Sequence, residues 1–169
     1  SELALADAHY LAEDYLLAAE AYKDFETLHP RHEAIPYVLY QLGMSLKKSY
    51  TSIDHSATAV NEALEYFTRL QQEYPDTEYG KNAADRIAEC RKTLAQRELF
   101  IANVFWGMEN YQAAWTRYQH VVRTYPDVKE EAEYARTKGE AAYLKYRQEE
   151  AQSMRELQQG SWKDWFRWL

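Results

Sequence analysis

Three dipeptides that end in proline recur along the chain, each preceded by the same residue types at the same distances. They are His29-Pro30, Tyr74-Pro75 and Tyr125-Pro126. Before each proline, alanine stands at position −12, an aromatic residue at −8 and an apolar residue at −5: Ala18, Ala63, Ala114; Tyr22, Phe67, Tyr118; Phe25, Leu70, Val121. Spacings of three and four residues place these side chains on one face of a helix. Because proline cannot continue a helix, the pattern predicts three helices that bury this face and end before the proline.

An aromatic stripe closed by proline is typical of the second helix of a tetratricopeptide repeat. Only 5 Gly and 4 Pro occur in 169 residues, too few for the many turns of an all-β domain of this length. The sequence therefore predicts an all-α fold: a tetratricopeptide-repeat solenoid, which is a right-handed superhelix of antiparallel helix pairs. The alanines and aromatic residues of the stripe are assigned to the core.

The spacing between prolines exceeds the 34-residue repeat, which indicates two insertions. From Pro30 to Pro75 is 45 residues, and from Pro75 to Pro126 is 51. The polar stretch 49–56 accounts for part of the first excess as a lengthened loop. Residues 81–106 contain neither Gly nor Pro. We therefore expect one lengthened central helix, over about residues 78–108.

We expect one solenoid over residues 1–159 and a Trp-rich tail over residues 160–169. The expected units of the solenoid are about 1–30, 35–75, 78–126 and 129–158. The fourth unit is predicted as a helix pair with a turn near Arg147.

Gly160-Ser161 is predicted to break the chain before a short helix in the tail. One face of that helix would carry Trp162, Trp165, Phe166 and Leu169. Three roles remain open for this face: a cap on the last repeat, a docking element for a partner, or a contact with a lipid interface.

The charge and composition exclude several classes of function. The net charge is −7, and residues 1–75 hold 12 acidic against 5 basic residues while the rest of the chain holds 15 of each. Such a chain repels phosphate backbones, so we expect no nucleic acid partner. No apolar run approaches the length that spans a bilayer. The single cysteine, Cys90, forbids an intrachain disulfide.

No residue pattern points to catalysis, a metal or a cofactor. Asp54, His55 and Ser56 have the residue types of a hydrolase triad, but adjacent residues do not present three side chains in a relay. His29 and His32 are only two neighbouring imidazoles, which is too few for a zinc site. A Gly-rich phosphate loop is also absent from the sequence. We expect a protein that is not an enzyme and that uses no cofactor.

Function in a repeat solenoid usually resides on the concave face, which the first helix of each pair lines. The repeat pattern places these residues toward that groove: Asp7, Tyr10, Tyr37, Tyr40, Met44, Lys47 and Trp106. Tyr, Trp and Met suit adaptable binding of apolar and aromatic peptides. The alternative, that some of these side chains pack between repeats, stays open.

Several segments together resemble the BamD (ComL) family of outer-membrane assembly lipoproteins over about residues 1–150. The matching segments are 28–32, 37–43, 54–58, 74–79, 91–95 with Glu98, 110–114 and 125–127. The resemblance accounts for both insertions. It places the start of this chain at the second repeat of the family, so the lipobox cysteine, the lipid anchor and the first repeat are expected to be absent.

The resemblance implies a non-enzymatic scaffold on the periplasmic face of the outer membrane. Its implied partners are the POTRA region of the barrel-forming BamA-type subunit and unfolded barrel precursors, with other lipoproteins of the complex as further candidates. Membrane contact would come only through the missing anchor. Arg117 matches by position a basic family residue that pairs with an acid on the barrel subunit.

A generic tetratricopeptide-repeat adaptor is the alternative function, either a periplasmic envelope coordinator or a co-chaperone that binds peptide tails. A carboxylate-clamp groove of the co-chaperone type needs several Lys, Arg or Asn residues on the first helices. The groove projected here is mainly aromatic, which favours the assembly scaffold.

Overall fold

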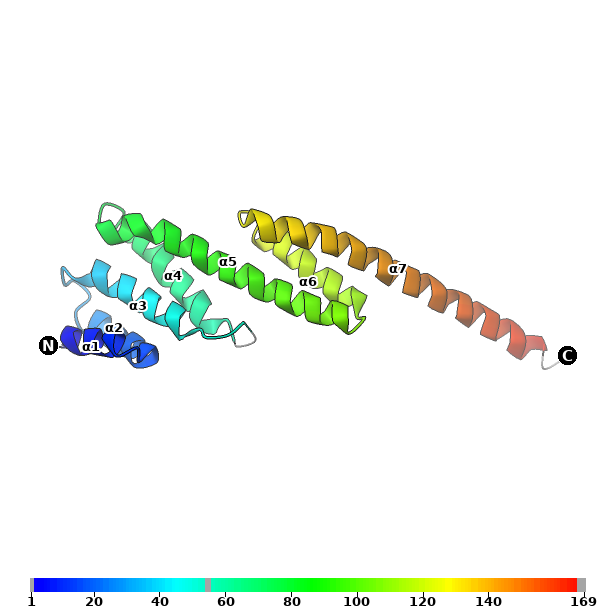
Figure 1. Cartoon of the computed structure of the whole chain (residues 1–169), viewed down its shortest axis with the longest axis horizontal. Coiled ribbons are helices and arrows are strands. Elements are labelled where there is room, and N and C mark those ends of the chain that lie inside the picture. The colour runs from blue at the N-terminus through cyan, green and yellow to red at the C-terminus, as the bar shows by residue number, and fades with distance from the viewer. Residues whose placement is uncertain (1, 54–55, 167–169) are drawn as a thin grey trace. The chain divides into compact units, whose positions relative to one another are not determined.

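The computed structural model describes residues 2–53 and 56–166, with side chains described up to residue 160, and within these ranges every regular element is a helix. Figure 1 shows the order of the helices along the chain. They are α1 (Glu2–Leu11), α2 (Tyr15–Leu28), α3 (Ile35–Ser49), α4 (Thr58–Glu73), α5 (Glu78–Gly107), α6 (Tyr111–Thr124) and α7 (Lys129–Phe166). The prediction of an all-α, tetratricopeptide-repeat-like fold is confirmed.

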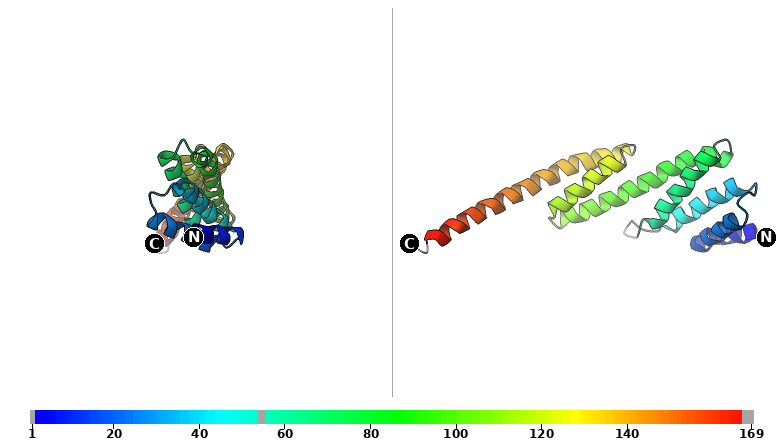
Figure 2. Two further views of the ribbon diagram at one scale, coloured as in Figure 1. Left: turned by 90° about the vertical axis from the view of Figure 1, so that its left-hand side faces the viewer. Right: turned by 180° about the vertical axis from the view of Figure 1, so that it is seen from behind.

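The chain divides into two compact units whose boundary lies within α5. Unit 1 is Ser1–Arg97 and unit 2 is Glu98–Leu169. In unit 1, α1 packs on α2, α2 on α3, and α3 on α4. In unit 2, α6 packs along the first part of α7, and both views of the ribbon show these two helices side by side (Figures 1 and 2).

The alanine-aromatic stripe forms the core of both units, as the sequence predicts. Each of its three alanines and three aromatic side chains is fully buried, at 0% exposure. The apolar residues at position −5 are also buried: Phe25, Leu70 and Val121. The stripe therefore specifies the packing and leaves function to other side chains.

All three helices that carry the stripe end in the same way, two residues before the proline. The residue before proline closes the helix, because its backbone N–H donates to the carbonyl four residues earlier, at N···O distances of 2.9 to 3.0 Å. These closing residues are His29, Tyr74 and Tyr125. Their φ angles lie between −124° and −132°, outside the helical region that proline disfavours for the residue before it.

The two insertions lie where the sequence places them. The chain between Ser49 and Thr58 forms a lengthened loop, of which residues 54–55 lie outside the described structure. Helix α5 spans 30 residues without interruption, in agreement with the predicted range of about 78–108.

The predicted helix pair after residue 129 was wrong, because α7 is one continuous helix of 38 residues. Neither the turn near Arg147 nor the break at Gly160-Ser161 is present. Strong helix formers fill this segment, and it contains no proline. An ion pair at i,i+3 joins Arg147 Nη1 to Glu150 Oε2 at 2.8 Å across the expected turn. One glycine costs a helix only about 1 kcal/mol, which these local interactions offset.

The described helices include none that is both long and apolar enough to cross a bilayer. The two longest of these helices, α5 and α7, carry charged residues along their length.

Gly43 on α3 lies at the close crossing point with α4. A Cβ atom at this position would lie 2.7 Å from Cζ of Phe67. Phe67 is fully buried, so its ring has little room to move away.

We expect Gly43→Ala to lower the free energy of unfolding by about 1–3 kcal/mol, the usual cost of overpacking a core. Urea unfolding followed by circular dichroism measures the change. Gly107→Ala is the matched control, because a Cβ there meets nothing within 4 Å. An unchanged midpoint for Gly43→Ala would show that α3 and α4 do not depend on this close approach.

Candidate functional site

Asp7 and Tyr37, both predicted to face the groove, are joined to each other and to the core. Oδ1 of Asp7 accepts hydrogen bonds from the Tyr22 hydroxyl and the Tyr37 hydroxyl, each at 2.6 Å. Burial, together with the hydrogen bond to Asp7, raises the pKa of Tyr22 far above its usual range. These groups therefore hold α1, α2 and α3 together, and Asp7 has a structural role.

Partly exposed rings continue from Tyr37 along α3. The Tyr37 ring lies 5.7 Å from Tyr79 of α5, measured between ring centroids. Tyr40 lies 5.5 Å from the same Tyr79 ring and 6.0 Å from the buried ring of Phe67. Tyr40 and Tyr37 thus pack on one side and remain partly exposed on the other.

Tyr10 belongs to a separate cluster at the turn between α1 and α2. Its ring lies edge-on to Tyr15 with a centroid distance of 5.6 Å. The ammonium of Lys48, from the end of α3, lies 4.8 Å from the Tyr10 centroid and 5.2 Å from the Tyr15 centroid. A hydrogen bond with the Tyr10 hydroxyl raises the pKa of Lys48, so the amine remains charged at neutral pH.

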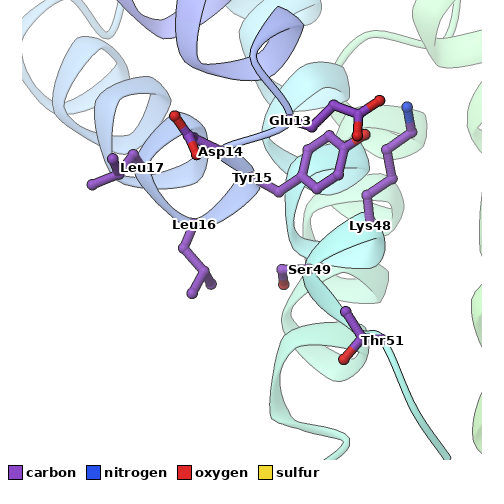
Figure 3. Close-up of a pocket in the computed structure, with 8 residues that line it drawn as sticks. All are labelled: Glu13, Asp14, Tyr15, Leu16, Leu17, Lys48, Ser49 and Thr51. Atoms are coloured by element: carbon purple, nitrogen blue, oxygen red, sulfur yellow. The ribbon is translucent and has the colours of Figure 1, made fainter.

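An open cavity of about 400 Å³ adjoins this cluster, between the start of α2 and the end of α3. Figure 3 shows Glu13, Tyr15 and Lys48 grouped together, with Leu16 lying apart from them. Leu16 and Leu17 are 66% and 50% exposed, so the side of the cavity formed by α2 is apolar. The lining residues are Glu13, Asp14, Tyr15, Leu16, Leu17, Lys48, Ser49 and Thr51. The cavity therefore combines apolar, aromatic and cationic surface.

Lys47, which the sequence places toward the groove, is engaged within unit 1, and its neighbour Lys48 lies over the rings of the cluster. Lys47 forms an ion pair with Glu89 of α5, and Arg86 joins the same carboxylate at 2.9 Å. Although burial would raise the pKa of Glu89, its hydrogen bond and charge interaction with Lys47 lower that pKa overall. Lys47 is thus an internal ion-pair residue. Met44 is half-buried on α3.

Sequence reasoning also missed the side chains of α2 that line the cavity, Tyr15, Leu16 and Leu17. The signal was present, because Tyr15 and Tyr111 stand at the same distance before Pro30 and Pro126. A shared position before proline marks the start of a helix and by itself does not indicate a binding site.

Trp106 and Arg117 lie in unit 2. Trp106 contacts Tyr111 edge-on at a centroid distance of 5.2 Å. Nη1 of Arg117 donates to Oε2 of Glu98 at 3.0 Å, and the Arg117 side chain is 43% exposed whereas that of Glu98 is 15% exposed. The guanidinium is therefore oriented by Glu98 and accessible to solvent.

The predicted tail residues Trp162, Trp165, Phe166 and Leu169 lie outside the part of the chain whose side chains are described. Their three alternative roles remain predictions.

The described side chains offer binding surfaces and little reactive chemistry. Among these residues no group of three or more His, Cys, Asp or Glu could hold a metal ion. Cys90 is fully buried, and this burial raises the pKa of its thiol to about 11. The thiol therefore stays protonated at neutral pH and is a poor nucleophile.

Comparison with known proteins gives one consistent family. Residues 1–158 match the family model YfiO, described as outer membrane lipoprotein. A Vibrio cholerae protein named outer membrane protein assembly factor BamD is 29% identical over 136 residues, which cover 75% of this chain and 56% of that protein. The proteins of the same name from Neisseria meningitidis serogroup A and Rickettsia prowazekii are 27% and 25% identical, over 76% and 74% of this chain and 52% and 50% of their own lengths. The chain thus spans about half the length of the curated relatives it matches.

Asp7→Ala should lower the free energy of unfolding by about 1–3 kcal/mol, because it leaves the hydroxyls of Tyr22 and Tyr37 without their acceptor. Asp7→Asn should cost much less, since an amide oxygen can accept both bonds. Urea unfolding of the two variants measures the difference. Equal losses would show that the charge of Asp7, and not its acceptor oxygen, matters.

Proposed function

Because the chain belongs to the YfiO family of outer membrane lipoproteins, we propose that it is a non-enzymatic adaptor for protein assembly at the periplasmic face of the outer membrane. Its relatives bear the name of outer membrane protein assembly factor. In this proposal the chain contributes two surfaces. Unit 1 binds unfolded precursors of barrel proteins, and Arg117 of unit 2 binds the POTRA region of the barrel-forming subunit.

The observation that carries the precursor proposal is the cavity beside Tyr10, Tyr15 and Lys48. Its aromatic faces and exposed leucines can bury apolar side chains of an extended segment, without requiring one fixed sequence. Precursor strands of a barrel alternate apolar and polar residues, so every second side chain is available for such contacts. An open cavity suits many different precursors better than a closed pocket does.

The adjoining rings of Tyr37 and Tyr40 extend the same kind of surface along α3. Both rings also contact the ring of Tyr79. Tyrosine provides a large rigid surface at low entropic cost, which favours contact with a disordered chain. Since these rings also pack in unit 1, their replacement would combine effects on binding and on stability.

The proposal for the barrel subunit rests on the geometry of Arg117. A guanidinium has five N–H donors, and among the described contacts Glu98 accepts from Nη1. The remaining donors can pair with a carboxylate of a partner in the fork geometry that arginine favours. Orientation by Glu98 reduces the entropy that Arg117 loses on docking.

Arg117→Glu should reduce copurification of the POTRA-bearing subunit from detergent-solubilised envelope by about tenfold, the effect of losing one charge-assisted pair. Quantitative immunoblotting of the bound fraction measures this loss. Arg123→Glu is the control, because Arg123 is an exposed arginine on the same helix. Equal recovery with both variants would remove Arg117 from the interface. Recovery of only a soluble chaperone by the unaltered chain would favour the generic adaptor instead.

Replacing both exposed cavity leucines, Leu16→Ser with Leu17→Ser, should lower photocrosslinking to unfolded precursor segments by about tenfold. The two side chains are exposed, so the substitution should leave the unfolding midpoint unchanged. Leu157→Ser is the matched control, since Leu157 is 70% exposed on α7. Crosslinking that is unaffected by the double substitution would show that precursors do not use this cavity.

A further inference from the structure

Unit 2 repeats, helix for helix, the hydrogen bonds that join α1, α2 and α3 in unit 1. Oδ1 of Asn103 on α5 accepts from the Tyr118 hydroxyl at 2.5 Å and from the Tyr134 hydroxyl at 3.2 Å. These partners correspond to Asp7 and its two tyrosines, Tyr22 and Tyr37. The unit 2 part of α5, together with α6 and α7, therefore corresponds to α1, α2 and α3.

The turn that follows α1 also matches the turn that follows α5. Glu13 and Glu109 are the only described residues other than glycine with positive φ, at 63° and 59°. Each donates its backbone N–H to the carbonyl three residues earlier, at 3.1 Å in unit 1 and 3.0 Å in unit 2. Each also accepts a bond from the tyrosine two residues later, Tyr15 or Tyr111. The two turns thus direct equivalent side chains to equivalent places.

An aromatic and cationic cluster forms at this turn in unit 2, as it does in unit 1. Trp106 and Tyr111 make the edge-on pair that Tyr10 and Tyr15 make in unit 1. The Lys138 ammonium lies 5.2 Å from the Trp106 ring centroid. The Lys145 ammonium lies 5.8 Å from the Tyr111 ring centroid.

The two clusters differ in charge at two corresponding positions. Lys145 corresponds to Lys48, because each stands eleven residues after the matching tyrosine, Tyr134 or Tyr37. Lys138 takes the position of the neutral Gln41. At the turn, Asn110 replaces Asp14.

Two lysines, Lys138 and Lys145, therefore lie over the rings of unit 2. In unit 1, Lys48 lies over the corresponding rings, and Glu13 and Asp14 line the adjoining cavity. Within the described part of the chain, no carboxylate forms an ion pair with Lys138 or Lys145. The unit 2 cluster consequently favours an anionic group.

Further rings lie next to this cluster and provide apolar surface. Trp115 on α6 contacts Tyr143 at a centroid distance of 5.1 Å and stacks on Tyr146 at 6.4 Å with an interplanar angle of 10°. Tyr143 is 40% exposed. A ligand held by the lysines would thus meet aromatic side chains at both α6 and α7.

We propose that Trp106, Tyr111, Lys138 and Lys145 form a second peptide-binding site, for a segment in which an aromatic side chain adjoins a carboxylate. The ammonium groups would bind the carboxylate through charge-assisted hydrogen bonds, and the rings would hold the aromatic side chain. The carboxylate belongs either to the peptide terminus or to an Asp or Glu side chain. This inference extends the proposed adaptor function, but it concerns a site that neither the cavity of unit 1 nor Arg117 contributes to.

The test is fluorescence anisotropy of the full chain with three labelled short peptides. The first ends in Phe with a free carboxylate, the second is its C-terminal amide, and the third is an amide with a Glu beside the Phe. Lys138→Gln with Lys145→Gln should weaken binding of the first peptide by about tenfold and reduce the dependence of its affinity on salt. The amide without Glu should bind weakly and be unaffected by the substitution.

The third peptide separates the two sources of the carboxylate. Binding of the first and third peptides alike would mean that either source is recognised. Binding of the first alone would restrict the site to chain termini, and binding of the third alone would restrict it to side-chain carboxylates. Each of these results supports the site, provided that the double lysine substitution abolishes the preference over the plain amide.

Lys81→Gln with Lys129→Gln is the control, because it removes the same charge at two exposed positions that are not part of the cluster. Trp106→Leu should also weaken binding of the first peptide, because leucine keeps apolar bulk but lacks the aromatic ring. Far-UV circular dichroism and urea unfolding establish that each variant folds. Loss of binding with both lysine variants would show a general charge effect and overturn the site.

Two other results would also overturn the inference. If the lysine variant binds the first peptide normally while Leu16→Ser with Leu17→Ser abolishes binding, peptides use unit 1 only and the adaptor proposal still stands. If phosphatidylglycerol vesicles but none of the peptides bind through Lys138 and Lys145, the surface is a lipid contact. Failure of the adaptor proposal appears separately, as unchanged copurification and precursor crosslinking in the Arg117 and leucine variants.

Discussion

In each unit, one side-chain oxygen that accepts hydrogen bonds from two tyrosine hydroxyls joins three successive helices. Asp7 provides it in unit 1 and Asn103 in unit 2. A fully buried hydroxyl without an acceptor is costly, so this bond restricts how the helices rotate and slide. Burial raises the pKa of Tyr118 to about 12, which keeps its hydroxyl a donor at physiological pH. The aromatic stripe fills the space around the acceptor, and the acceptor fixes the register.

This fixed register determines which side chains remain outside the core. The turn that follows the first helix of each unit carries an edge-on aromatic pair, and the third helix places a lysine over it. The same framework thus presents similar surfaces twice, while substitutions at its edge change their charge. A duplicated scaffold with altered edge residues is a simple physical route to two binding preferences in one short chain.

The fold was predictable where a residue type has a strong local effect. Proline ends α2, α4 and α6, and the alanine-aromatic stripe is buried in both units. The break in α7 was wrongly predicted, because a glycine-serine pair weakens a helix by less than its neighbours stabilise it. For the site, Tyr10, Tyr37, Tyr40 and Trp106 lie on α1, α3 and α5, and their contact with a peptide stays a prediction. The ion pair of Lys47 with Glu89 was not predictable, because it depends on a helix far along the chain.

The sequence by itself determined the helical class, the buried stripe, the two insertions and the family resemblance, because each depends on periodicity or on a backbone constraint local to the chain. Only the tertiary structure decided which polar side chains are internal partners and which remain available. Asp7 and Lys47 are engaged within unit 1, while Lys138 and Lys145 lie over rings in unit 2. Neighbouring residues on a helix differ by about 100° in direction, so the helix opposite, and not the sequence, selects between them.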